Sequence, residues 1–303
     1  MPVRFHPWQL AVALICLCLA LVALARWRAT RVYPARELVR VLPADGATLI
    51  YLDAALLRDT GYLDALLSGS RANQEAEYLE FVEQTGFDYR ADLDTVAAAF
   101  SPSASYFALR GRFQWKQLTT YAATAGGTCR YAICTMPGST PERNISFYPL
   151  KPDVLALAVS PDPRAVTLIS ASQPVPVREL PSEPVWISTP TSVLRRPGAL
   201  PFSLEAMLAP LVDADHLVLA AGPLGDHAQL RLQAFCRSPQ SALSVEQQLA
   251  AAIQVLKASG QDTAKDPSGL AALLAGGSLE HKDHLVTGTW PVQRSFLETI
   301  FAR

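Results

Sequence analysis

The sequence contains little charge, and the charge it contains is balanced. Charged residues make up 17% of its 303 residues, and Lys+Arg 26 against Asp+Glu 27 gives a formal net charge of -1. Because a domain that binds a phosphate backbone is strongly basic, this balance excludes a nucleic-acid partner. Hydrophobic residues make up 50%, which excludes a disordered chain and is enough for one large domain or two ordinary ones.

Motifs that would fix a reaction are also lacking. The chain has no G-x-S-x-G nucleophile elbow, no P-loop and no G-x-G-x-x-G fingerprint. We therefore predict no bound cofactor. The absence of these motifs favours a non-enzymatic binding or assembly module over an enzyme.

A long uncharged run is present near the amino terminus. Residues 8–25 carry no charged side chain, and at about 1.5 Å per residue a helix over this run spans roughly 27 Å, close to the hydrocarbon core of about 30 Å. We predict that residues 8–25 enter a membrane. Residues 1–25 then act either as a transmembrane anchor or as a cleaved signal segment, because Ala23-Leu24-Ala25 fits an A-x-A cleavage pattern.

Proline and glycine divide the rest of the chain. Residues 26–46 are predicted to be a linker, and residues 173–184 a Pro-rich connector between a first half, 47–172, and a second half, 185–303. Both halves read strand, helix, hairpin, helix, hairpin, helix. This order predicts an α+β fold of pseudo-duplicated antiparallel sheets with helices on one face. The two halves form either one continuous sheet or two domains.

Hydrophobic periodicity predicts the individual elements of the two halves. Strands are expected at 48–53, 95–100, 105–113, 128–135, 144–150, 153–159, 185–188, 216–221, 228–236, 277–281 and 284–290, and helices at 73–85, 115–124, 162–172, 203–211, 244–259 and 292–301. Ser244 and Gln247 fit a capping box at the start of the helix over 244–259.

Two stretches of the first half resemble a group of known proteins. They are Leu42-Pro-Ala-Asp45 leading into Thr48–Asp53, and Phe107–Phe113 leading into a helix with Tyr121-Ala122. Both resemble parts of uncharacterised bacterial envelope proteins that carry an N-terminal hydrophobic segment. The resemblance implies a bacterial cell envelope and an envelope protein as partner, and it implies no catalytic residue.

The side of the membrane on which the body lies has two interpretations. Only Arg4 precedes the hydrophobic run, whereas four arginines follow it: Arg26, Arg28, Arg31 and Arg36. By the positive-inside rule, these arginines favour the cytoplasm. A short basic start, an apolar run and one long body are instead typical of exported proteins. We favour the extracytoplasmic side of the bacterial inner membrane, with the cytoplasmic side as the alternative.

The cysteines predict neither a redox site nor a compartment. Cys16 and Cys18 lie within the apolar run, which leaves Cys129, Cys134 and Cys236 in the body. If Cys129 and Cys134 belong to one strand, their side chains point to opposite faces and cannot bridge each other. We expect all three to be small buried apolar side chains.

His281 and His284 form the best candidate for a metal site. If Lys282 and Asp283 make a two-residue hairpin turn, the two imidazoles face each other across the ladder at about 5 Å between Cβ atoms. A zinc site needs three or four ligands, and no third ligand follows at a recognisable spacing. The alternative function is therefore a metal-dependent hydrolase near His281 and His284. The other interpretation of the pair is two solvated turn residues.

Overall fold

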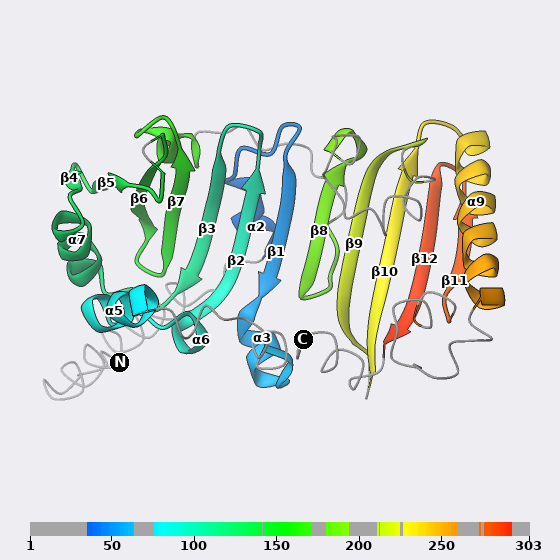
Figure 1. Ribbon diagram of the computed structural model, residues 1–303, viewed down its shortest axis with the longest axis horizontal. Coiled ribbons are helices and arrows are strands. Elements are labelled where there is room, and N and C mark those ends of the chain that lie inside the picture. The colour runs from blue at the N-terminus through cyan, green and yellow to red at the C-terminus, as the bar shows by residue number, and fades with distance from the viewer. Residues whose placement is uncertain are drawn as a thin grey trace, which may run out of the picture.

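The computed structural model describes residues 35–63, 76–140, 142–170, 180–193, 211, 213–224, 227–259, 273 and 276–292. They form a mixed α+β fold built on a 12-stranded antiparallel sheet, in the order β11-β12-β10-β9-β8-β1-β2-β3-β7-β6-β5-β4 (Figure 1). The strands are β1 (Thr48–Asp53), β2 (Leu93–Phe100), β3 (Ser105–Gly111), β4 (Thr128–Arg130), β5 (Ile133–Pro137), β6 (Asn144–Lys151), β7 (Val154–Ser160), β8 (Val185–Pro190), β9 (Ala214–Leu224), β10 (His227–Cys236), β11 (Ser278–Lys282) and β12 (Leu285–Val292). The α-helices are α2 (Ala35–Arg40), α3 (Ala54–Asp59), α5 (Ala76–Thr85), α6 (Tyr89–Asp92), α7 (Trp115–Thr124) and α9 (Pro239–Ser259).

The two halves of the chain meet in the middle of the sheet. β1 pairs with β8, with Tyr51 opposite Trp186, so the halves form one continuous sheet and not two domains with separate sheets. Outward from this pair, the order β1-β2-β3-β7-β6 on one side matches β8-β9-β10-β12-β11 on the other. The predicted antiparallel α+β architecture is confirmed. A duplication would produce this matched order, although the duplication itself stays a prediction.

The sheet has two faces, which we name by the helices that cover them. The α2 face carries the residues in register with Tyr51 and Trp186, and the α9 face carries those in register with Ile50 and Ile187. The prediction that helices cover only one face is wrong, because α2 lies on one face and both α7 and α9 lie on the other. The reason is that the central strands are apolar at successive positions, so both faces carry apolar side chains on which a helix can pack.

Helix α2 belongs to the core. Leu38, Val39 and Leu42 in and just after this helix are 0%, 1% and 1% exposed, and they pack with Tyr51 and Trp186 on the α2 face. The predicted linker 26–46 is therefore core from α2 onward. Pro43 and Gly46 lie between α2 and β1, where the chain leaves the helix and turns into the strand.

Some predicted helices and strands match the structure residue for residue, and others do not. β1 and α7 begin and end at the predicted residues, whereas the helix predicted at 162–172 is only a short 3₁₀ turn, Ala165–Leu168. α9 begins before the predicted Ser244, because Ser238 and Ser241 cap it reciprocally: each backbone N–H donates to the other hydroxyl, at 3.0 and 3.1 Å.

Three predicted segments lie outside the described residues: the membrane segment 8–25 and, apart from Leu211 and Val292 at their ends, the helices at 203–211 and 292–301. Val292 is the last residue of β12 and not the start of a helix. Within the ranges that the structure describes, no helix is long and apolar enough to cross a membrane.

Candidate functional site

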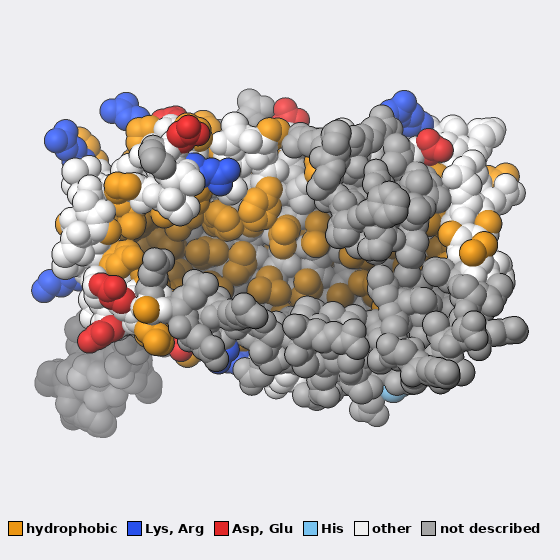
Figure 2. All heavy atoms as spheres, in the orientation of Figure 1, with side chains coloured by type: hydrophobic (Ala, Val, Ile, Leu, Met, Phe, Trp, Pro, Cys, Tyr) orange, Lys and Arg blue, Asp and Glu red, His pale blue; other side chains and the backbone are white. Residues whose placement is uncertain are grey.

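The middle of the α9 face is a broad apolar surface, which we call the apolar trough. It is formed by side chains of β3, β2, β1, β8, β9 and β10 that share one face by register. They are Phe107, Val96, Ala98, Phe100, Ile50, Leu52, Val185, Ile187, Leu219, Ala221, Leu230 and Leu232. In Figure 2 apolar side chains gather over the middle strands in a hollow of the molecule.

Several residues of the apolar trough remain open to solvent. Phe100, Ile187 and Leu219 are 37%, 37% and 38% exposed. Their neighbours on the other face differ sharply, since Trp186 and Ala220 are each 1% exposed. Exposed leucines scattered singly are ordinary, but a contiguous apolar patch is typical of a binding surface.

Helices border the apolar trough at both ends of the sheet. At one end α9 covers the outer strands through Val245 and Leu249, which pack with Val286 of β12. At the other end α7 covers them through Leu118 and Ala122, in a cluster with Phe147 and Leu155 that also takes in Phe81 of α5. Among the described residues, α9 packs on Leu217 of β9 and Leu232 of β10, and the α7 cluster takes in Leu109 of β3. The side chains of β2, β1 and β8 lie between these two helical borders (Figure 1).

No residue of the apolar trough carries an ionisable side chain. On the opposite face, β10 and β12 are polar, with Gln229, Arg231, Gln233 and Thr287 in register. Acid–base or nucleophilic catalysis needs such groups at the reacting atoms. The trough can therefore bind apolar groups but has no side chain for chemistry.

The two predicted metal ligands do not face each other. The β11–β12 turn is made by Asp283 and His284, one residue later than predicted, so His281 lies opposite Val286. The later turn shifts the partner of His281 two residues along the chain and leaves His284 in the turn itself. His281 Nδ1 instead lies 2.7 Å from Glu246 Oε2 of α9. Within the described ranges, no group of three or more His, Cys, Asp or Glu side chains is placed to hold a metal ion.

Ser188 and His216 make a contact that sequence reasoning missed. Ser188 Oγ lies 2.7 Å from His216 Nε2, across the β8–β9 pair on the α2 face. This distance suits a nucleophile and its base. Ser188 is, however, only 8% exposed, so the contact joins two strands inside the sheet and leaves the hydroxyl out of reach of a substrate.

Burial raises the pKa of the nearby Tyr51. Desolvation, followed by the negative charge of Asp53, raises the pKa of Tyr51 to about 12, while Arg110 and a hydrogen bond with Thr95 act in the opposite direction. A phenol with this pKa is protonated at neutral pH. Tyr51 therefore serves packing, stacked on Trp186 at 5.5 Å between ring centroids.

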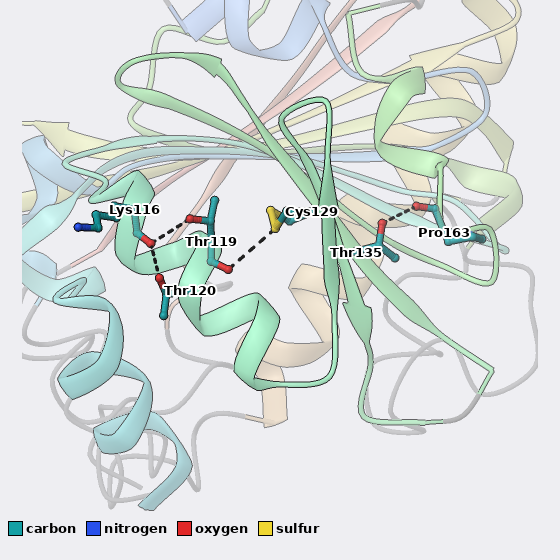
Figure 3. The surroundings of a disulfide bond; sticks show 7 residues. Lys116, Thr119, Thr120, Cys129, Thr135 and Pro163 are labelled. Carbon is teal, nitrogen blue, oxygen red and sulfur yellow. Dashed lines mark hydrogen bonds between the residues drawn. A yellow bond between two sulfur atoms is a disulfide. The ribbon is translucent and has the colours of Figure 1, made fainter.

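The prediction that Cys129 and Cys134 cannot bridge is wrong. The segment 128–135 is not one strand but the hairpin β4–β5, in which Cys129 lies directly opposite Cys134. The two form a disulfide, and Cys129 Sγ also lies 3.9 Å from the Thr119 carbonyl of α7 (Figure 3). The disulfide therefore links β4 to β5 at the edge of the sheet, next to α7. Cys236, in contrast, is a free buried thiol, as predicted.

The hairpin turn itself explains the error. Tyr131 and Ala132 form it with φ of 51° and 67°, as in a type I′ turn, which normally takes Asn-Gly. No turn residue marks this position in the sequence, and Tyr131 is 99% exposed at the tip.

Comparison with known proteins adds little. No protein-family model and no curated protein matches the chain. Among solved structures, crystal forms III and I of TP0453 align over 87% of this chain and 97% and 96% of that protein, with TM-scores of 0.45 and 0.46 and identities of 8% and 9%. We draw no conclusion about function from similarity at this level.

Proposed function

We propose that the protein is a non-enzymatic binding module on the extracytoplasmic side of a bacterial inner membrane, tethered through residues 8–25. The apolar trough is its binding surface. One observation carries this proposal: the described central strands are apolar on both faces, and their side chains on the α2 face are buried, whereas Phe100, Ile187 and Leu219 on the other face are 37%, 37% and 38% exposed. Burying such a surface gains about 25 cal/mol per Å², so a partner with an apolar side is favoured there.

The disulfide supports the extracytoplasmic side. Cys129 and Cys134 are bonded to each other, and the free Cys236 is buried, where desolvation raises the pKa of its thiol. Structural disulfides persist in oxidising compartments and are rare in the cytosol. The disulfide therefore favours an extracytoplasmic body over the cytoplasmic position that the arginines after the hydrophobic run indicate.

Adjacent lysine substitutions on the two faces test whether the apolar trough is open. Leu219→Lys is expected to lower the free energy of unfolding by about 1 kcal/mol or less, because the lysine stem lies along the trough and its ammonium reaches water. Ala220→Lys, one residue along β9, puts the same charge into the core and is expected to cost several kcal/mol. Thermal unfolding of the purified full chain, followed by circular dichroism, measures both.

An equal loss of unfolding free energy in Leu219→Lys and Ala220→Lys would contradict the proposal. It would show that residues of the chain itself cover Leu219 as fully as Ala220 is covered on the α2 face. The trough would then be core and not a binding surface.

The position of the body is a separate prediction. We expect a phosphatase that is active only outside the cytoplasm to be active when fused after Arg303, because the disulfide marks an oxidising compartment. The size of the product also shows whether residues 1–25 are retained as an anchor or removed. An inactive fusion on a stable, full-length, membrane-bound product would place the body in the cytoplasm.

A further inference from the structure

We infer that the partner of the apolar trough is an amphipathic α-helix of another protein, lying on the central strands between α7 and α9. This inference rests on the proposed function, since it names the occupant of the same surface. It is drawn from how the chain covers the rest of that face.

The α9 end shows what fits on this surface. α9 places Ala242, Val245 and Leu249 on the sheet, at the spacing of three and four residues that lines up one side of a helix. Leu232 of the apolar trough packs against that same cluster. The trough is therefore the continuation of an existing helix–sheet interface.

The α7 end repeats the arrangement. Leu118 and Ala122, four residues apart, pack on the outer strands of the first half. Leu109 and Leu157, on the same face as Phe107, pack against this cluster. A helix already covers the α9 face at each end, and the surface between them has the same kind of residues.

The open space has the width that a helix needs. Side chains of β3 and β10 already pack against the α7 and α9 clusters. The four strands between them, from β2 to β9, span about 14 Å at roughly 4.8 Å per strand, and a helix with its side chains is about 10–12 Å across. A second copy of this face does not fit, because stacked sheets approach to about 10 Å and α7 and α9 of both copies would fill that gap.

An extended peptide is a poorer occupant than a helix. The trough is the face of a sheet, so its backbone groups are already paired in the ladder and offer nothing to a peptide backbone. An extended segment laid there would bury unpaired N–H and C=O groups, each at a cost of about 1–3 kcal/mol. A helix bonds its own backbone and presents only side chains.

Crosslinking to a defined peptide tests the inference. The full chain in phospholipid nanodiscs carries the photoreactive amino acid p-benzoylphenylalanine in place of Ile187, Leu219 or, as a control on the α2 face, Gln233. The probe is a biotinylated peptide of roughly 18 residues with leucines at helical spacing and a mixed Glu/Lys polar side. A second peptide has the same composition with the leucines at alternate positions.

We expect biotin adducts from positions 187 and 219, about ten-fold more with the helical peptide than with the alternating one, and none from position 233. Ile187→Lys should remove the adduct at position 219. Equal adducts with both peptides, or adducts with nanodisc phospholipid alone, would overturn the helix inference and leave the proposed function standing. No adduct at all, or crosslinks only within the chain, would overturn both.

Discussion

Trp186→Ala is expected to lower the free energy of unfolding by about 3–5 kcal/mol. Trp186 is 1% exposed and stacks on Tyr51 across the β1–β8 pair, at 5.5 Å between ring centroids and 16° between planes. It packs in one cluster with Leu38 and Val39 of α2. Alanine would leave a cavity where the two halves of the sheet meet. Both halves should therefore still unfold in one cooperative transition, at a lower temperature.

Two matched variants control this result. Trp186→Phe keeps a ring against Tyr51 and removes an indole N–H that finds no hydrogen-bond partner among the described residues. It leaves a smaller cavity than alanine does, so it should lower the free energy of unfolding by about 1–2 kcal/mol. Ile187→Ala changes the next residue of β8, on the α9 face. It should lower the free energy of unfolding by about as little as Trp186→Phe, because Ile187 is already 37% exposed. If Trp186→Ala and Ile187→Ala lowered the unfolding temperature equally, the assignment of the two faces would be wrong.

Replacing both Cys129 and Cys134 by serine is expected to lower the free energy of unfolding by about 2 kcal/mol. The disulfide closes a short loop, because the two cysteines are 5 residues apart, and the entropy of that loop in the unfolded chain gives this value. The bond also opposes the strain of a turn in which Tyr131 and Ala132 both have positive φ.

Reduction provides the control for the disulfide variant. Thermal unfolding of the unmodified chain with reductant should match that of the serine variant, and the serine variant should not respond to reductant. An unmodified chain that unfolds at the same temperature with and without reductant would show that the bond does not stabilise the sheet edge.

Much of the fold could be predicted because local patterns and tertiary structure agree. β1 is bounded by Gly46 and by Asp53, which caps α3, and α7 ends before Gly126 and Gly127. Where the chain turns without a turn residue, prediction failed. Tyr131 and Ala132 look like strand residues, and placing the β11–β12 turn one residue early put His281 opposite the wrong partner.

The apolar trough could not be predicted for a different reason. Ile50, Ile187 and Leu219 read as ordinary core residues, since a strand buried on both faces and a strand with one open apolar face have the same sequence pattern. The exposed fractions of the described residues distinguish the two faces, with Ile187 and Leu219 at 37% and 38% and Trp186 at 1%. Likewise, α2 looked like part of a linker because its buried residues lie close to Pro34, Pro43 and Gly46.

Photocrosslinking in living cells tests the central claim most directly. The full chain is produced with p-benzoylphenylalanine at position 187 in one strain and at position 233, on the polar part of the α2 face, in another. If the apolar trough is a binding surface, irradiation should give a discrete larger product from position 187, with a peptide of another protein in it, and none from position 233. The claim is contradicted if position 187 yields no adduct, or yields only crosslinks to the chain itself.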